Sequence, residues 1–576
     1  MRKLAVLAAA ILASCHGDGR YLGNITPPSQ QRLVYVDTYE PSSLDPYMAL
    51  EVPEFSLANA LFEGLTVTNP VTTEPMAGMA THYEISADGK TLTFYLRGHA
   101  SPKGTRLPDI GTLPPEFSHG ERAPPDSVPG RWSDGGTVTA NDFVYALRRV
   151  YDPKAAMPYW ERVIVNSADI AAGKRRPEEL GVSAPDEFTL RIQLTVPAQY
   201  FLVALAVSTS PVPRGAVEKA RAQGQPEDWS KPGAIIGNGP FVVKEWRPYD
   251  YIRIAKSSTY YLKNSVRLEE IKLLPLPSGP PVINLYRAGE AQAIYTDSLP
   301  LSLVPALQSK TDFHRDRQYG MLMFFLNLYE PPFDNQLVRW AVNMAIDKSA
   351  LAKYWQTEVQ RHVVPALPGY TPPESRIVAV NGKKYDVMAY DLAGARELLA
   401  RAGYSYTDGK HLTFSINCTN NEQGMQTAEI VRSLLKTALN AEIRVNAMEQ
   451  KVLSEGSSSG TSHGASLYAW TADSADPYML LNPEMVEIYA GFRDAGYYSE
   501  LDAANQTIDP GLRLRKLAEC EARLMESMPI IPMCGFPAVY LAKPYVRGLP
   551  SDPLGRVWYR YGWIDAKWKP DTGWKP

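Results

Sequence analysis

The most informative segment of the sequence is WSDGGTVTANDFVY, from Trp132 to Tyr145. Within it, Thr139 and Asp142 have the spacing of a capping box, in which each side chain accepts a hydrogen bond from the other residue's backbone N–H. The residues that follow place apolar side chains on one helical face: Phe143, Leu147 and Val150. The segment therefore predicts a helix that begins just after Thr139 and packs one face against a core.

Strand patterns lie on both sides of this helix. Apolar and polar residues alternate, as in strands that bury one face, in three segments: Leu92–Leu96, Phe188–Leu194 and Leu412–Ile416. A helix is predicted to begin after Asp391 and to end at Gly403. Another helix is predicted over Thr427–Leu439, followed by a strand at Ile443–Val445. Helices and strands alternate along the chain, so the predicted fold class is mixed α/β.

The composition is typical of a large folded protein. The chain has 576 residues, 45% of them hydrophobic and 21% charged, with a net charge of -3. This length predicts about two to four folding units. The apolar content argues against intrinsic disorder, and the balanced charge gives no reason to expect nucleic acid as a partner. Residues 101–131 are rich in Pro and Gly and predict an exposed insertion.

The first residues have the pattern of a bacterial export signal. Two basic residues precede the apolar run Leu4–Leu12, which is shorter than the roughly 20 residues that span a bilayer. The run ends in Leu-Ala-Ser-Cys at Cys15, which resembles the lipobox of bacterial lipoproteins, where the Cys is lipidated. The alternative is an ordinary secretory signal. We predict a lipoprotein signal peptide over residues 1–15 and a polar tether over residues 16–30.

Other chemical signals are sparse. The remaining cysteines, Cys418, Cys520 and Cys534, are odd in number, so at least one thiol cannot pair within the chain. The longest later apolar run, Phe201–Val207, predicts a buried element rather than a membrane span. No zinc-ligand spacing and no phosphate-binding loop occur, so we expect neither a metal nor another cofactor.

One catalytic pattern does occur. Residues 456–460 fit G-x-S-x-G, with Ser458 as the candidate nucleophile of a secreted serine hydrolase. That motif requires a strand before the serine and a helix after it, which together strain the turn. Residues 454–464 are rich in Ser and Gly and instead predict a flexible loop, so we prefer a linker to an active site.

A set of short motifs occurs in a fixed order along the chain. The motifs are Ser43–Pro46, Leu61–Leu65, Asp88–Arg97, Trp132–Tyr145, Ser210–Pro213, Gly237–Phe241, Pro332–Asp334 with Val338–Arg339, and Trp470–Asp473 with Asp476–Pro477. In this order and spacing the chain resembles the oligopeptide-binding proteins of bacterial peptide importers, within the extracellular solute-binding proteins of family 5.

The resemblance implies a periplasmic-binding-protein-like fold of type II, cluster C. Two lobes with mixed sheets would close on a cleft, beside an extra domain. Domain I, a ligand lobe, would be assembled from three segments: 31–62, 186–296 and 536–576. Domain II, the extra lobe with the insertion, would take residues 63–185, and domain III, the second ligand lobe, residues 297–535.

The resemblance also implies where a ligand binds. Asp473 would bind the α-ammonium of a peptide, and Trp470 would line the same pocket. A carboxylate in a closed, dry cleft is costly without an opposite charge, so this pairing is physically sound. The alternatives are that Asp473 caps a helix opened by Asp476–Pro477 and that Trp470 is a core aromatic.

Backbone pairing would supply the remaining affinity. Strand addition is indifferent to the ligand's side chains. The resemblance implies that the ligand pairs with Leu50, Glu51 and Val52 from domain I, and with Tyr468, Ala469 and Trp470 from domain III. The alternative for the first of these segments is a surface loop.

Two departures from the family pattern concern the same site. Leu467 stands where some relatives carry an Arg that can meet a ligand carboxylate, so the way a peptide C-terminus is held does not carry over. Thr471 and Gly320 stand where some relatives have a disulfide, and both halves are missing together. A preference for tripeptides is not carried over either.

The expected function is capture of peptides and their delivery to an ABC transporter permease, with no bond chemistry and no cofactor. We expect a monomer in the periplasm or another extracytoplasmic compartment, held at the membrane by its lipid anchor. The same fold also serves receptors for nickel complexes, haem, sugars or opines. An Asp that faces an ammonium favours a ligand with a free amine.

Overall fold

The computed structural model describes residues 20–570 with short gaps. The gaps are residues 38–39, 42, 50–51, 152–162, 198–200, 203–204, 206–208, 296–298, 317, 356, 358–362, 365–366, 368–369, 372–376, 381–382, 388, 408, 459–461, 473, 536 and 550–551. Four predicted functional residues lie outside the described residues: Cys15, Leu50, Glu51 and Asp473. The predicted signal peptide lies outside them as well.

A seven-stranded mixed sheet forms the first lobe from segments far apart in the sequence. Its order is β13 (Phe313–Asp316), β21 (Ala538–Ala542), β12 (Ala293–Ile294), β1 (Arg32–Asp37), β11 (Glu270–Pro275), β10 (Tyr251–Lys256) and β9 (Phe241–Arg247). The central strand β1 is parallel to both its neighbours, and the other pairs are antiparallel. Because β13 pairs with β21, this sheet extends past residue 297, where domain III was expected to begin.

The second lobe is built on a five-stranded mixed sheet. Its order is β18 (Glu442–Met448), β17 (Thr413–Thr419), β19 (Ala465–Thr471), β14 (Gly320–Leu326) and β20 (Ile530–Gly535). Among its helices, α13 (Glu422–Leu439) packs on β17 and β18, and α16 (Pro483–Ala490) packs on β14. Other helices of this lobe are α10 (Gln336–Ala345), α11 (Lys348–Tyr354), α12 (Leu392–Arg401), α14 (Gln450–Ser458), α15 (Tyr478–Leu481), α17 (Ala495–Asn505) and α18 (Pro510–Ser527).

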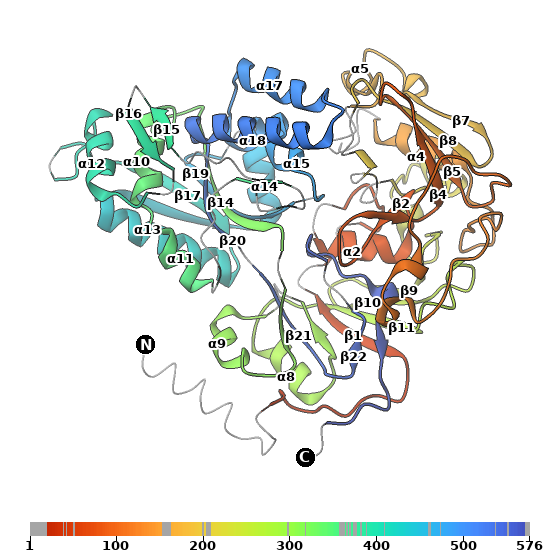
Figure 1. The fold of residues 1–576 in the computed structure, drawn as a ribbon. Coiled ribbons are helices and arrows are strands. Elements are labelled where there is room, and N and C mark those ends of the chain that lie inside the picture. The colour runs from red at the N-terminus through yellow and green to blue at the C-terminus, as the bar shows by residue number, and fades with distance from the viewer. Residues whose placement is uncertain are drawn as a thin grey trace.

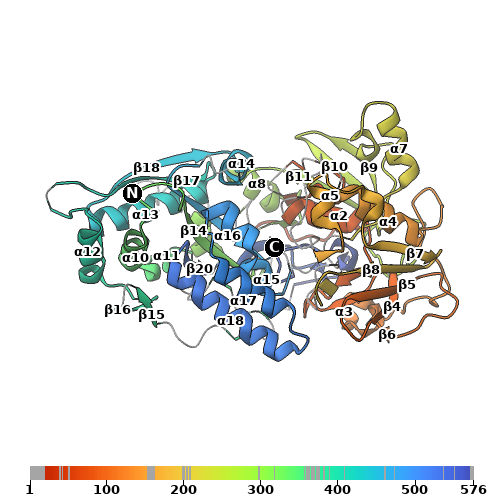
Figure 2. The same cartoon turned by 90° about the horizontal axis from the view of Figure 1, so that it is seen from above.

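An antiparallel sheet forms the extra lobe. Its order is β6 (Thr105–Arg106), β4 (Ala80–Ile85), β5 (Thr91–Leu96), β8 (Thr189–Gln193) and β7 (Val182–Asp186), and α4 (Ala140–Val150) packs on β7 and β8. Figures 1 and 2 show the second lobe on one side of the molecule, with the first and extra lobes together on the other. The second lobe joins the first through two connections, from β13 to β14 and from β20 to β21.

Several local predictions are confirmed. Thr139 and Asp142 form the capping box of α4, with Thr139 N–H donating to Asp142 Oδ2 at 2.8 Å. Asp391 caps α12 by accepting from Gly394 N–H at 2.9 Å, and Gly403 follows with a φ of 85°. The strands predicted from alternation correspond to β5, β8 and β17, and the predicted strand after α13 corresponds to β18.

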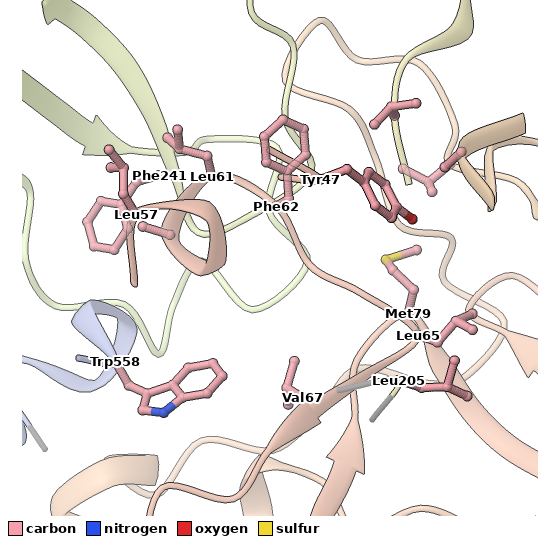
Figure 3. Packing of buried hydrophobic residues seen from close by; sticks show 14 of the residues in the cluster. Tyr47, Leu57, Leu61, Phe62, Leu65, Val67, Met79, Leu205, Phe241 and Trp558 are labelled. Carbon is pink, nitrogen blue, oxygen red and sulfur yellow. The ribbon is translucent and has the colours of Figure 1, made fainter. Parts of the chain in front are cut away.

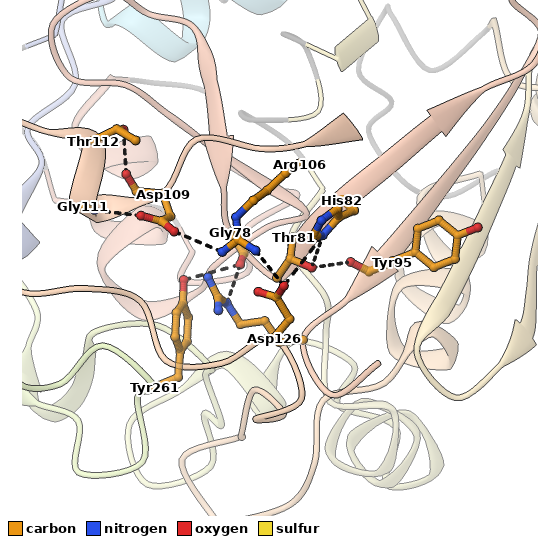
Figure 4. Close-up of polar contacts among 11 residues, drawn as sticks. Gly78, Thr81, His82, Tyr95, Arg106, Asp109, Gly111, Thr112, Asp126 and Tyr261 are labelled. Atoms are coloured by element: carbon orange, nitrogen blue, oxygen red, sulfur yellow. Dashed lines mark hydrogen bonds and ion pairs between the residues drawn. The ribbon is translucent and has the colours of Figure 1, made fainter. Parts of the chain in front are cut away.

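More than half of residues 101–131 are exposed, as predicted, but buried side chains anchor the segment to the rest of the protein. Four apolar side chains of this segment are buried: Leu107, Ile110, Leu113 and Phe117. The ring of Phe117 lies 5.9 Å from that of Tyr561, near the C-terminus. Figure 4 shows Arg106 between Asp109 and Asp126, at 3.3 and 2.8 Å. The segment therefore packs the extra lobe against the C-terminal part of the first lobe.

The tether predicted for residues 16–30 is wrong from residue 20 onward. Leu22 and Ile25 are buried against the first lobe. Leu22 N–H donates to Asp312 Oδ2 at 3.1 Å, and Leu22 C=O accepts from Lys543 Nζ at 2.8 Å. Burial lowers the pKa of Lys543 to about 8, against the opposing charge of Asp312. The expectation of a tether now rests on residues 16–19 alone.

One continuous apolar core joins the first and extra lobes. Figure 3 shows Leu57 and Leu61 of α2 (Val52–Leu61) in the same cluster as Phe241 of β9 and Val67. The second lobe has a separate core, which includes the side chains of β14. The extra lobe is therefore fixed to the first, whereas the second lobe has its own interior.

Glu63 is a buried charge inside the shared core. Its Oε2 lies 2.8 Å from Arg560 Nη1, and the hydroxyls of Tyr260 and Tyr261 donate to the same carboxylate. Its backbone N–H donates to Asn238 Oδ1 at 2.9 Å. Burial alone would lower the pKa of Arg560, but the opposing effect of Tyr260 and Glu63 raises it above its ordinary value.

The glycines around Asn238 make this contact possible. A Cβ on Gly237 would lie 2.2 Å from Leu61 O, and one on Gly239 would lie 2.6 Å from Leu61 C. These distances are too short for any side chain, so the segment can approach the end of α2 only with glycine at both positions. Two of the family motifs therefore meet at Glu63 for structural reasons.

We predict that Glu63→Leu destabilises the protein by about 3–5 kcal/mol, because it leaves Arg560 buried without a counter-charge. Urea unfolding followed by tryptophan fluorescence measures this. The control Arg247→Met removes a pair with Glu245 whose Arg side chain is 61% exposed, and should change stability far less, because water already screens this pair. Equal effects of the two variants would contradict the structural role of Glu63.

Candidate functional site

Residues of the predicted ligand motif lie on β19, which has one incompletely paired edge. On one side, β14 pairs along the whole strand, from Gly320 with Thr471 to Leu326 with Ala465. On the other side, β17 reaches only Ala465 and Ser466. Among the described residues, no strand lies beside Leu467–Thr471 on that side.

The register shows which backbone groups the open edge presents. Ala472 N–H donates to Tyr319 C=O at 3.0 Å, and Asn327 N–H donates to Gly464 C=O at 2.9 Å. Backbone groups alternate sides in an antiparallel pair, so the even-numbered residues of β19 point theirs at β14. The N–H and C=O groups of the odd-numbered residues, from Leu467 to Thr471, therefore point to the open edge. An extended chain can pair with groups arranged in this way.

An aromatic cluster covers one face of this strand. The rings of Tyr468 and Trp470 pack against Phe325 of β14 and Tyr489 of α16, and the Trp470 and Tyr489 centroids are 5.1 Å apart. Tyr468 is buried and its hydroxyl donates to Leu453 C=O at 2.9 Å, whereas Trp470 is half-buried. The core-aromatic alternative therefore describes Tyr468 better than Trp470. Ala469 is exposed.

The resemblance implied that Val52 lies in a strand, but the structure places it in a helix. It begins α2, and the Ser56 hydroxyl donates to its C=O at 3.0 Å. Pro53 is suited to this place, since the first turn of a helix does not use its N–H. The implied strand is therefore wrong at Val52, whereas its contact with a ligand stays a prediction.

The connection from β13 to β14 is held by a loop near the C-terminus. Tyr319 N–H donates to Pro553 C=O at 2.7 Å, and Leu554 packs into the core of the second lobe. Asp552 shapes this loop by accepting from the N–H groups of Leu554 and Arg556, both at 2.9 Å. Burial raises the pKa of Asp552. A first-lobe segment thus reaches the second lobe beside the end of β19.

A buried ion pair fixes the chain just after the ligand motif, and the sequence analysis missed it. Arg513 of α18 donates to both carboxylate oxygens of Asp476, at 2.8 and 3.0 Å. Asp476 also accepts from Tyr478 N–H at 2.9 Å, at the beginning of α15. The side chain that accepts a backbone hydrogen bond at the start of α15 is thus that of Asp476. The Asp-Pro pair at 476–477 was the available signal.

The structure describes all three residues at which the chain departs from the family pattern: Gly320, Leu467 and Thr471. Gly320 and Thr471 are paired in register at the ends of their strands. Leu467 is buried in the core of the second lobe and brings no charge to the open edge. The three described cysteines are buried free thiols. Burial raises the pKa of Cys418 to about 11 and those of Cys520 and Cys534 to about 12.

The hydrolase alternative at Ser458 is not supported. Ser458 ends the helix α14, which also contains Gly456 and Ser457, so no strand precedes the serine. The predicted loop is therefore wrong over residues 454–458. Tertiary packing explains the helix, because Leu453 is buried and Ser457 Oγ lies within hydrogen-bond distance of the Tyr468 hydroxyl oxygen, at 2.8 Å.

The described part of the chain shows neither a metal site nor a membrane-spanning helix. Within the described ranges, no group of three or more His, Cys, Asp or Glu side chains could hold a metal ion. In that same part of the chain, no helix has both the length and the apolar character to cross a membrane.

The architecture is shared with solved structures of periplasmic receptors. The Escherichia coli murein tripeptide-binding protein MppA superposes with a TM-score of 0.78 at 26% identity, covering 94% of this chain and 99% of that one. Haemophilus influenzae OppA in complex with RPPGFSPFR superposes with a TM-score of 0.77 at 24% identity, covering 94% and 100%. The fold is therefore periplasmic-binding-protein-like.

Residues 130–485 match the family described as bacterial extracellular solute-binding proteins, family 5 (middle). The chain belongs to this family, as its ordered motifs predict. The periplasmic oligopeptide-binding protein OppA of Escherichia coli K12 is 28% identical over 98% of both chains. The dipeptide-binding protein DppE of Bacillus subtilis is 26% identical, over 94% of this chain and 92% of the relative.

Proposed function

We propose that this protein captures peptides between its two lobes and delivers them to the permease of an ABC importer. The open edge of β19 carries the proposal, because backbone groups at Leu467–Thr471 can pair with an extended peptide of any sequence. The printed names of OppA and DppE, which refer to oligopeptides and dipeptides, support it. The work is capture and closure, with no bond chemistry.

The lobes would close about their two connections. A ligand that touches β19 and the first lobe together favours the closed state by its extra contacts there. The three-domain division is kept in this proposal, with residues 63–185 as the extra lobe. The boundary between domains I and III is moved to follow β13, which pairs within the first sheet.

Asp473 is the proposed partner of the peptide α-ammonium. It follows Ala472, whose N–H bonds the connection between the lobes at Tyr319. Every peptide with a free N-terminus brings this positive charge, so one carboxylate can select peptides without reading their side chains. The alternative ligands of this fold that have no amine would leave the carboxylate unpaired.

Asp473→Asn should weaken binding of the tightest-bound of di-, tri- and tetra-alanine by about 100-fold or more, because a buried ion pair loses one partner. The N-acetylated form should bind the wild type poorly and respond little to the substitution. Isothermal titration calorimetry measures both effects. Equal binding of free and acetylated peptide by the wild type would remove Asp473 from the site.

Ala469→Pro tests strand addition at the open edge. Proline removes the N–H that Ala469 presents to the ligand and should weaken peptide binding by about 10-fold or more. Ala469→Val keeps that N–H and should bind within about 3-fold of the wild type. Calorimetry gives the affinities, and thermal unfolding confirms that both variants are folded. Unchanged affinity in the folded proline variant would contradict backbone pairing here.

The proposed receptor is a monomer attached to the membrane through a lipid on Cys15. The first lobe holds the chain from Arg20 onward, since Thr311 N–H donates to Arg20 C=O at 2.6 Å. A lipid on Cys15 would therefore keep the first lobe close to the membrane surface, because few residues separate it from Arg20.

Cys15→Ala should release the protein into the soluble fraction of cell envelopes, since the thioether attachment for the lipid is lost. Fractionation and immunoblotting measure the distribution. The matched control Cys418→Ala changes a buried thiol and should leave the protein in the membrane fraction. Retention of the Cys15 variant in membranes would refute lipidation.

A further inference from the structure

A buried amide lies where the two lobes meet. Gln318 lies in the connection between β13 and β14, and only 8% of this residue is exposed. The next residue, Tyr319, accepts a hydrogen bond from Ala472 N–H at 3.0 Å. Gln318 therefore lies one residue from the backbone hydrogen bond that joins Tyr319 to Ala472, and Ala472 directly precedes Asp473 in the chain.

The surroundings of Gln318 come from the first lobe. A Cβ on Gly555 would lie 2.7 Å from Gln318 Nε2, 3.2 Å from the Tyr295 hydroxyl oxygen and 3.5 Å from Val52 Cγ1. Gly555 has a φ of 81°, a conformation that favours glycine, so the loop can approach this closely. The Tyr295 hydroxyl donates to Gly555 C=O at 2.7 Å. The Gln318 amide thus lies beside the first-lobe loop at Gly555, and its backbone neighbour Tyr319 bonds Ala472 at the end of β19.

The carbonyl oxygen of this amide has no hydrogen-bond partner among the described residues. Gln318 Oε1 is buried and accepts no hydrogen bond there. A buried acceptor without a donor costs about 1–3 kcal/mol, so such an atom requires an explanation. Gln292 in the same lobe provides a contrast, since its Oε1 accepts from Val34 N–H at 2.7 Å and its Nε2 donates to Gly289 C=O at 2.9 Å.

We propose that Gln318 Oε1 accepts a hydrogen bond from the ligand's primary ammonium, for which Asp473 is the proposed charged partner. This proposal rests on the proposed function, and it names a further residue that sets specificity. An ammonium group carries three N–H donors. The carboxylate can accept two of them, and Gln318 accepts the third. The site then prefers primary amines to secondary ones, which have one donor fewer.

The test compares peptides whose N-termini carry three, two or no ammonium donors. The tightest-bound of di-, tri- and tetra-alanine is prepared with a free, an N-methyl and an N-acetyl terminus, and calorimetry gives the affinity of each. For the wild type, N-methylation should weaken binding by about 10-fold, because one charged hydrogen bond is lost. Acetylation reports on Asp473, so the two assignments are tested separately.

Gln318→Met keeps the length of the side chain and removes its acceptor. We expect this variant to bind the free peptide about 10-fold more weakly than the wild type and to lose most of the penalty for N-methylation, to within about 3-fold. A purely structural role would lower the affinity for both peptides alike. The penalty for N-methylation therefore separates a ligand contact from a packing effect.

Gln292→Met is the matched control, because it removes a buried amide whose two ends already have partners in the protein. It should lower stability and keep the wild-type penalty for N-methylation. If Gln318→Met also keeps the full penalty, a buried water satisfies Oε1 and the proposal is wrong. If the wild type binds none of the free peptides, the proposed function fails and this inference fails with it.

Discussion

The buried carboxylate of Glu63 is the constraint on which the arrangement of the first and extra lobes depends. A charge with no exposure to water persists only when its oxygens are satisfied, and here the donors come from Tyr260, Tyr261 and Arg560. Arg560 lies 497 residues away in the sequence. All these segments must be in place together, and only one arrangement of the lobes allows that. Such a pair contributes less to net stability than to selecting a single structure.

The motifs that identify the family mostly hold the lobes together. Leu61–Leu65 and Gly237–Phe241 meet at Glu63, and the Asp45 carboxylate of Ser43–Pro46 pairs with Arg149 of α4. Within the second lobe, Asp476 pairs with Arg513 of α18. A receptor that pairs with ligand backbone needs few specific side chains at the ligand. The proposed site accordingly consists of a strand edge, one carboxylate and one amide.

Local patterns predicted local structure well, and the failures share a physical cause. The capping box at Thr139 and Asp142 needs only contacts within one turn, so the sequence alone indicates it. The insertion, the tether and residues 454–458 were assigned from their Pro, Gly and Ser content. The tether and the insertion each contain a few apolar residues, such as Leu22 and Phe117, that are buried by distant parts of the chain, and residues 454–458 directly follow the buried Leu453. No periodic pattern marks such isolated anchors, so the composition was misleading.

The sequence by itself determined the mixed α/β class, many of the helices and strands, the family and the position of Asp473 as the candidate ammonium partner. Only the tertiary structure decided that β17 leaves β19 after Ser466 and that Val52 begins a helix. It also decided that Gln318 Oε1 is buried without a partner among the described residues. The reason is that an open edge or an unpaired buried atom depends on which distant segments meet. Pairing of that kind is set by the whole folded chain, whereas capping and alternation are set by near neighbours.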